Sequence, residues 1–332
     1  MSKLKFLFWL CWGYVAFISL WLMLRILWFD HPWWLGFVTY LAVYLFAPLP
    51  LILVVSLWKR CRRLLFGLTI PTIAFSIFYG VLFLPSLSSR AQGAGDSIKV
   101  MTFNVFSGNK DHKGIMRAIR ASRPDIVGLQ EINPKLTTAL VQTSAKDYPY
   151  RAITSPTPGQ PAGVGILSRF PIETATAFPL PGGRLGIQAV LRVNHQRLNV
   201  VVVDLLHDPT LKTPAPQVPS VATEYSENKV IEIKQLKQEL LHEGLPFLLL
   251  CDCNLADTSQ AYKQIAKFAR DSFRKVGWGF GHTLYLKPIP FPVQRFDYIW
   301  YSDGMVATEA RVGQDRGGSD HLPVFAQFKL YE

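Results

Sequence analysis

Three long apolar runs occupy the start of this 332-residue chain, at residues 6–24, 34–58 and 64–87. Each is long enough to cross the hydrocarbon core of a bilayer as a helix, which takes about 20 residues. The first run is rich in tryptophan and is followed by no small-residue cleavage motif, so it does not resemble a signal peptide. Buried helices of a soluble protein are the alternative, but three such runs in so short a stretch disfavour it. The sequence therefore predicts three transmembrane helices, the second kinked at Pro48 and Pro50.

Basic residues predict how these helices are oriented. Lys3 and Lys5 precede the first run, and the connection between the second and third runs contains Lys59, Arg60, Arg62 and Arg63. Lysine and arginine are enriched in cytoplasmic connections, so the N-terminus and this connection are predicted to be cytoplasmic. Three spans then place the rest of the chain on the extracytoplasmic side of an integral, multi-pass membrane protein.

Charge becomes frequent and mixed in sign beyond the third run. Residues 1–96 contain 8 Lys/Arg and 2 Asp/Glu, which leaves 35 − 8 = 27 basic and 23 − 2 = 21 acidic residues in the remainder. Residues 88–97 are mostly small or polar and suit a flexible linker. The predicted organisation is a membrane region at 1–87, a linker at 88–97 and a globular domain at 98–332. The globular domain is long enough to bury a large core without disulfides or a structural metal ion.

Two of the four cysteines, Cys251 and Cys253, lie in one short run. Residues at i and i+2 of a strand point to the same face, so these side chains are expected to lie side by side. The favoured interpretation is a pair of buried thiols, because cysteine is one of the most frequently buried residue types. Half of a metal site is the alternative, although no other cysteine could complete it.

From residue 97 onward the hydrophobic pattern becomes that of mixed strands and helices. Residues 111–122 and 228–242 have helical periodicity, and the apolar seam of the second runs through Val230, Ile233, Leu236, Lys237 and Leu240. Strands are predicted at residues 98–105, 126–130, 163–168, 187–193, 198–206, 247–250, 296–301 and 323–328. A hairpin-like pair among them favours a two-sheet, four-layer α/β sandwich over a doubly wound parallel sheet.

Several of these strands end in a carboxylate, an amide or an imidazole, which has no packing use at the end of an apolar strand. These side chains are Asn104, Glu131, Asp252 with Asn254, Asp297, and Asp320 with His321. If the strand ends converge, they form a pocket rich in oxygen acceptors, which suits a hard divalent cation such as Mg²⁺. Each pattern alone is also typical of a solvated strand end, so the prediction depends on their occurring together.

Six short motifs in order resemble the endonuclease/exonuclease/phosphatase superfamily, which includes deoxyribonucleases, sphingomyelinases and inositol-polyphosphate phosphatases. They are TFNV at 102–105, PDIVGLQE at 124–131, GILSRF at 165–170, DCN at 252–254, RFDY at 295–298 and SDH at 319–321. Any one of them could match by chance, but six in order are specific. They extend over essentially the whole predicted globular domain and leave the membrane region outside the resemblance.

The resemblance implies a role for each matching residue. Glu131 would be a direct ligand of Mg²⁺ or Mn²⁺, with Asp320 and Asn104 beside the ion. Asp252 would orient or activate the attacking water, whereas Asn254 and Asn104 would contact the substrate phosphate. His321 would act on the scissile phosphate and Asp297 would pair with it, which fixes the tautomer of the imidazole and favours its charged form.

One strand departs from the family pattern. A histidine normally ends the strand predicted at 198–206, but His207 comes one or two residues late. A slip of one residue turns a side chain to the other face of a strand, so His207 reaches the site only if a bulge corrects the register. His207 is therefore a catalytic candidate, and the alternative is a histidine in the loop that follows the strand. Arg169 is a further candidate for phosphate binding, although a solvated arginine is the ordinary interpretation.

The predicted function is a membrane-tethered, metal-dependent phosphoesterase that hydrolyses phosphodiester or phosphomonoester bonds with an activated water. The substrate is left open between a nucleic acid, which the basic excess favours, and a phospholipid head group, which the membrane anchor favours. The expected partners are this substrate and the lipid bilayer, with no obligate protein partner evident. A catalytically silent scaffold or binding domain of the same fold is the alternative, and retention of the six acidic, amide and imidazole positions argues against it.

Overall fold

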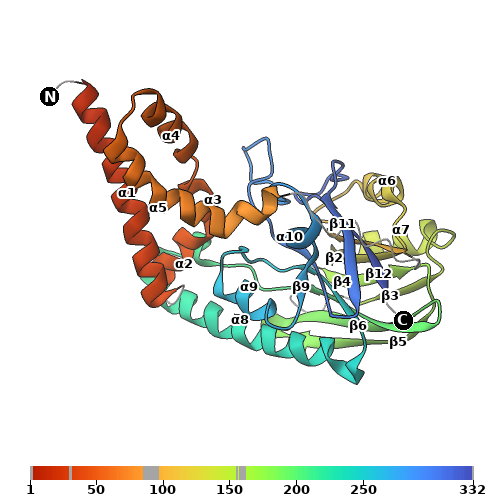
Figure 1. Cartoon of the computed structure of the whole chain (residues 1–332). Coiled ribbons are helices and arrows are strands. Elements are labelled where there is room, and N and C mark those ends of the chain that lie inside the picture. The colour runs from red at the N-terminus through yellow and green to blue at the C-terminus, as the bar shows by residue number, and fades with distance from the viewer. Residues whose placement is uncertain (1–2, 30–31, 85–96, 155, 157–161, 331–332) are drawn as a thin grey trace. The chain divides into compact units, whose positions relative to one another are not determined.

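The computed structural model describes residues 3–29, 32–84, 97–154, 156 and 162–330 (Figure 1). Contacts divide the chain into two compact units, one formed by Met1–Leu84 with Ala256–Tyr262 and the other by Pro85–Leu255 with Lys263–Glu332. The linker predicted at residues 88–97 lies outside the described residues except for Ser97.

The first unit consists mainly of apolar helices. Two stretches, Lys5–Trp28 and Arg62–Phe83, are long and apolar enough to cross a membrane, which confirms two of the predicted spans in length and composition. The predicted second span is broken, since Trp33–Tyr40 and Ala42–Trp58 meet at a bend of 71° and make a third crossing only if they act together. The helices are α1 (Lys3–Trp28), α2 (Trp33–Tyr40), α3 (Ala42–Leu45), α4 (Leu49–Trp58) and α5 (Arg62–Tyr79).

The second unit contains two six-stranded sheets of mixed direction, as predicted for an α/β sandwich. The first sheet has the order β11 (Met305–Val312), β12 (Val324–Leu330), β1 (Ser97–Asn104), β2 (Ile126–Ile132), β4 (Gly163–Ser168) and β3 (Tyr150–Ile153). The second has the order β5 (Ile172–Leu180), β6 (Arg184–Val193), β7 (Gln196–Asp204), β8 (Phe247–Asp252), β10 (Asp297–Tyr301) and β9 (Arg270–Asp271). Strands β3, β5, β9 and β11 were not anticipated by the sequence patterns.

Helices cover the outer faces of both sheets and complete the four layers (Figure 1). On the first sheet, α6 (His112–Ser122) and α7 (Pro134–Thr143) pack through Ile115 and Leu136 onto a core that includes Phe103 and Leu129. The side chains of Asp111 and Asn133 accept hydrogen bonds from the first turns of these helices and so define where they begin. On the second sheet lies α8 (Val218–Leu240), which begins ten residues before the predicted helix. The short helices α9 (Gln260–Ile265) and α10 (Ser272–Val276) follow β8 along the chain.

The two sheets approach each other closely at Gly128 of β2. A Cβ atom on this residue would lie 2.7 Å from Leu250 Cβ of β8 and 3.0 Å from Val202 Cγ2 of β7. Close by, the Gln130 side chain donates to the Leu250 carbonyl at 3.1 Å, so a hydrogen bond also links the sheets. The absence of a side chain at Gly128 therefore sets the separation of the two sheets beside the strand ends.

We predict that Gly128→Ala destabilises the protein by about 1–3 kcal/mol, the usual cost of forcing an extra carbon into a packed core. Thermal unfolding of the full chain in detergent measures this change. Thr176→Ala, at an exposed position of β5, is the control and should stay within about 0.5 kcal/mol of wild type. Equal unfolding midpoints for the two variants would show that the sheets do not meet at Gly128.

Candidate active site

Polar strand ends from both sheets meet at one edge of the sandwich. In the first sheet, Asn104 at the end of β1 is level with Gln130 of the parallel strand β2. In the second, Asp252 at the end of β8 is level with Asp204 of the parallel strand β7 and with Asp297 at the start of the antiparallel strand β10. Three aspartates therefore lie side by side across the second sheet, facing the polar end of the first.

Asn104 joins the two sheets at this edge. Its amide nitrogen Nδ2 donates to Glu131 Oε1 at 3.0 Å and to Asp252 Oδ2 at 2.8 Å. Its oxygen Oδ1 accepts from the backbone N–H of Phe106 at 2.9 Å, which fixes the orientation of the amide. The Asn104 carbonyl accepts from Ser319 Oγ at 2.7 Å, and the same hydroxyl oxygen accepts from the His321 N–H at 3.0 Å. The side chain of Asn104 thus places Glu131 and Asp252, and its backbone carbonyl places the segment that carries His321.

Glu131 reaches this position through a bulge in β2. Leu129 pairs with Gly165 and Ile132 with Gly163, so β2 contains one residue more than its neighbour β4 over this stretch. Glu131 itself has a φ of 56°, in the left-handed region. The bulge directs Glu131 to Asn104, although the preceding residue, Gln130, also points toward the second sheet. Burial opposes ionisation of Glu131, but hydrogen bonds from Asn104 and from Ser107 lower the pKa of its carboxyl below the usual value.

His321 forms a buried pair with Asp297. Its Nδ1 lies 2.7 Å from Asp297 Oδ2, and its Nε2 lies 3.7 Å from Asp252 Oδ2. Burial by itself would lower the pKa of His321, but the carboxylates of Asp297 and Asp252 raise it to about 10. Burial also raises the pKa of Asp252 to about 7, against the attraction of the His321 imidazolium. At neutral pH the site therefore contains a charged imidazole beside a carboxyl group that can exchange a proton.

Asn254 and Asp204 make up the other side of the cluster. Asn254 Nδ2 donates to the Leu205 carbonyl at 2.9 Å and to Asp204 Oδ1 at 3.2 Å, while the Asn254 N–H donates to Asp252 Oδ1 at 3.1 Å. Asp204 was not among the predicted site residues, because the strand was expected to continue to residue 206. Its position after an apolar run, like that of Asp252, was the signal that could have revealed it.

Asp320 provides a buried acceptor oxygen near the cluster. Its Oδ1 is buried and, among the described residues, has no hydrogen-bond partner. Burial raises the pKa of Asp320, the nearby carboxylates of Glu131 and Asp297 raise it further, and His321 opposes them. A buried oxygen without a donor, beside a second carboxylate, is the kind of ligand that a hard cation satisfies. These residues therefore fit a divalent metal ion.

A second group of possible metal ligands consists of Asp252, Asp297 and His321, whose ligand atoms lie within 4.8 Å of one another. The short contact from His321 Nδ1 to Asp297 already occupies one of these atoms. The oxygen ligands Glu131 and Asp320 thus match a hard ion better than this mixed group does.

The cysteines on either side of Asp252 are bonded to each other. Cys251 and Cys253 form a disulfide with their Cα atoms 5.0 Å apart, so the prediction of two buried thiols was wrong. Neighbouring positions on one face of a straight strand lie about 6.6 Å apart. Here β8 ends at Asp252 and the chain turns, which brings Cys253 within the range of a disulfide.

Two predicted residues lie outside the hydrogen-bonded cluster. His207 lies three residues beyond the end of β7 and has an exposed side chain. Burial lowers the pKa of its imidazole while the charge of Glu131 raises it, so His207 is near Glu131 and stays a candidate. Arg169 pairs with Asp125 at 3.2 Å, next to the start of β2, whereas Glu131 lies near the end of that strand. The remaining predicted residues, Asn104, Glu131, Asp252, Asn254, Asp297, Asp320 and His321, lie together at the strand ends.

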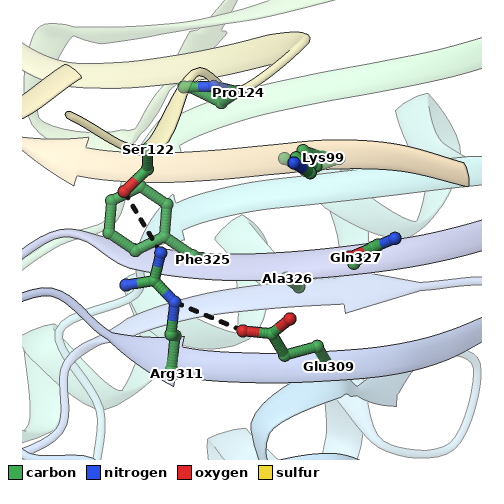
Figure 2. A pocket seen from close by; sticks show the side chains of 9 residues that line it. Lys99, Ser122, Pro124, Glu309, Arg311, Phe325, Ala326 and Gln327 are labelled. Atoms are coloured by element: carbon green, nitrogen blue, oxygen red, sulfur yellow. Dashed lines mark hydrogen bonds and ion pairs between the residues drawn. The ribbon is translucent and has the colours of Figure 1, made fainter. Parts of the chain in front are cut away.

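A shallow pocket at the opposite end of β1 contains none of the candidate site residues (Figure 2). Figure 2 shows Arg311 beside Phe325, paired with Glu309 at 3.3 Å and donating to Ser122 Oγ at 3.2 Å. Lys99, at the start of β1, also lines this pocket. The pairing of Arg311 within the protein gives this pocket no evident chemistry, so the strand-end cluster remains the candidate site.

Comparison with known proteins agrees with this geometry. The model of the endonuclease/exonuclease/phosphatase family matches residues 101–321. The chain belongs to this family. No curated protein sequence matches it.

Solved structures of similar fold come from organisms that are far apart. The catalytic domain of human Nocturnin with bound sulfate has 17% identity and a TM-score of 0.55, over 71% of this chain and 95% of that chain. TDP2 of D. rerio with a single-strand DNA product has 16% identity and a TM-score of 0.56, over 70% and 99%. A mannosyl-6-phosphatase from Bacteroides thetaiotaomicron has 17% identity and a TM-score of 0.54, also over 70% and 99%. At these identities the likeness establishes the fold alone.

The left-handed conformation of Glu131 leads to a prediction about stability. Neither Glu131→Ala nor Glu131→Gly retains the carboxylate, so the two variants differ mainly in backbone strain. Alanine at this φ costs about 1–2 kcal/mol, which exceeds the conformational entropy that glycine loses on folding. We expect Glu131→Gly to be more stable than Glu131→Ala by about 0.5–1 kcal/mol in thermal unfolding. The reverse order, which is normal within a strand, would exclude the bulge.

Proposed function

We propose that this chain is a membrane-tethered, divalent-metal-dependent phosphoesterase that hydrolyses phosphodiester or phosphomonoester bonds with an activated water. The observation that carries the proposal is the buried His321–Asp297 pair beside Asp252, which Asn104 connects to Glu131. Phosphoester hydrolysis needs a cationic group for the phosphate, a base for water and a group that stabilises the leaving oxygen. The strand-end cluster provides side chains for each of these tasks.

Asp252 and His321 have the protonation states that this reaction needs. A carboxyl group with a pKa of about 7 can accept a proton from water at neutral pH, which suits Asp252 as the general base. His321, with a pKa raised to about 10, remains charged and can donate a hydrogen bond from Nε2 to a phosphoryl oxygen. Asp297 holds Nδ1, so the free energy of the imidazolium depends on it. Asn254 would bind the phosphate by exchanging the longer hydrogen bond of its Nδ2, to Asp204 Oδ1 at 3.2 Å, for one to a phosphoryl oxygen.

Glu131, Asp320 and Asn104 are the residues that would hold Mg²⁺ or Mn²⁺. The support is the buried Asp320 Oδ1 and the lowered pKa of Glu131, which keeps that carboxylate charged. When bound, the ion would supply positive charge that neutralises the phosphoryl oxygens as the reaction proceeds.

Two substrate classes agree with the chain, a nucleic acid and a phospholipid head group. Among the similar structures, one contains a single-strand DNA product and another is named as a mannosyl-6-phosphatase, which leaves both a nucleic acid and a smaller phosphate ester open as substrates. The excess of 27 basic over 21 acidic residues beyond residue 96 favours a polyanion. Attachment to a bilayer would favour the lipid.

The catalytic unit is proposed to lie on the extracytoplasmic side. The basic residues around Arg60 support this orientation if the bent pair Trp33–Tyr40 and Ala42–Trp58 crosses the bilayer as one span. The Cys251–Cys253 disulfide supports it independently, because disulfides persist in oxidising compartments.

A substrate panel tests the proposed activity. Full-length protein in detergent is expected to hydrolyse at least one of bis(p-nitrophenyl) phosphate, p-nitrophenyl phosphate, DNA and phospholipid in the presence of Mg²⁺ or Mn²⁺. Excess chelator should abolish the activity, and Asp252→Asn should lower it by ~10²–10⁴-fold, the scale of a positioned base. Binding without turnover of every substrate would instead identify a silent scaffold of the same fold.

The His321–Asp297 pair predicts different pH profiles for two variants. His321→Ala should lower kcat/KM by ~10²–10⁴-fold at every pH. Asp297→Ala removes the largest contribution that raises the pKa of His321, so the imidazole should lose its proton as the pH rises above about 6.5. The ratio of Asp297→Ala to wild-type kcat/KM should therefore increase as the pH falls from about 8 to 6. Parallel profiles for the two variants would exclude the pair from the mechanism.

A further inference from the structure

Helix α8 buries charge where its sequence predicts an apolar seam. Lys229 is 4% exposed and Glu232 0%, whereas the neighbouring Val230 and Ile231 are 54% and 47% exposed. Only part of the predicted seam, including Ile233 and Leu236, faces the second sheet. A helix that exposes apolar side chains in order to bury a lysine and a glutamate loses stability, because both ions must leave water. Some other role for these two charges is therefore needed.

The buried charges bind one short stretch of backbone, Asp204–Leu206, which consists of the last residue of β7 and the two residues after it. Glu232 Oε1 accepts from the Leu206 N–H at 2.8 Å, and Lys229 Nζ donates to the Leu206 carbonyl at 2.6 Å. Arg184 Nη1, from the start of β6, donates to the Asp204 carbonyl at 2.7 Å. Arg184 and Lys229 also both pair with Glu232, so the three side chains form one ionic cluster.

The same stretch of backbone also forms hydrogen bonds with Asp252 and Asn254 of the candidate site. The Leu205 N–H donates to the Asp252 carbonyl at 2.9 Å, and the Leu205 carbonyl accepts from Asn254 Nδ2 at 2.9 Å. Asp204 Oδ1 is the second acceptor for Asn254. Asp204–Leu206 thus lies between the ionic cluster and Asn254, and every polar backbone group from the Asp204 carbonyl to the Leu206 carbonyl is hydrogen-bonded.

We propose that Arg184, Lys229 and Glu232 are positioning residues. By fixing Asp204–Leu206 they hold the Asn254 amide through its bond to the Leu205 carbonyl, so that its longer bond, to Asp204 Oδ1, can be exchanged for one to the substrate phosphate. This inference rests on the proposed function, since Asn254 is assigned there to the phosphate. A rigid connection is needed because a hydrogen bond to a phosphate depends on the direction of the donor as well as on its distance. Apolar side chains in place of the cluster could fill the space but could not hydrogen-bond the Asp204 carbonyl, the Leu206 N–H and the Leu206 carbonyl.

The test compares Arg184→Met with a matched control in the full-length protein with Mg²⁺. Arg197→Met removes another arginine–glutamate pair, with Glu173 at 3.0 Å, from the opposite end of β7. Arg184→Met should raise KM for bis(p-nitrophenyl) phosphate by about tenfold with a smaller change in kcat, the size expected when a hydrogen bond to a charged group is lost. It should weaken the affinity for inorganic phosphate, measured by calorimetry, by the same factor. Arg197→Met should leave both values unchanged.

A double-mutant cycle decides whether Arg184 acts through Asn254. In an Asn254→Ala background, Arg184→Met should have almost no further effect on KM or on phosphate affinity, because the group that it positions is gone. Independent, multiplicative effects would overturn the proposal, and so would an unchanged phosphate affinity in Arg184→Met. If Arg184→Met has no thermal unfolding transition, Arg184→Lys serves in its place, since it keeps the charge but cannot donate from two separate nitrogens.

The two measurements separate this proposal from the proposed function. If wild type hydrolyses no substrate but binds phosphate, the proposed function fails and the phosphate affinities of the variants still decide the role of the cluster. If wild type neither hydrolyses nor binds phosphate, both proposals are overturned.

Discussion

The amide nitrogen of Asn104 lies between a carboxylate of each sheet, and the candidate site is organised around this shared donor. Glu131 and Asp252 would repel each other if both were charged and unsupported, but each accepts one hydrogen bond from the same group. The amide can do this only if the sheets stay at a fixed separation, which Gly128 permits by having no side chain between them. The close approach of the two sheets at Gly128 therefore determines both how the sandwich packs and how the polar side chains at its edge are bonded.

The charges at this edge are stabilised in different ways. Hydrogen bonds keep Glu131 ionised, whereas burial raises the pKa of Asp252. His321 stays protonated because the carboxylates of Asp297 and Asp252 raise its pKa. The arrangement costs stability, because buried carboxyl groups lie close together and two residues of the site, Glu131 and Asn254, adopt left-handed backbone conformations. An anionic substrate and a divalent cation would together offset this cost, which is the usual reason for such groups to persist in a site.

Much of the fold and most of the site could be predicted from the sequence, because apolar strands that end in polar residues are a local pattern. Asp204 was missed, because the apolar residues Leu205 and Leu206 that follow it extended the predicted strand and hid the signal of a carboxylate after an apolar run. The bulge at Glu131 was also invisible, because it depends on pairing with β4 rather than on the residues of β2. For the same reason the helical period placed Val230 in the core, whereas hydrogen bonds to the end of β7 place Lys229 and Glu232 there.

The pairing of β1 with β12 has a consequence for how the domain is made. These strands are the first and the last of the domain, and they lie antiparallel next to each other in the middle of a sheet. Asn104 ends one of them, and His321 comes shortly before the other begins. During synthesis the first sheet thus stays divided until its final strand emerges, and His321 cannot reach Asn104 before that. A nascent or truncated chain would lack the complete candidate site, so the proposed hydrolysis could begin only after the last strand had been made and paired.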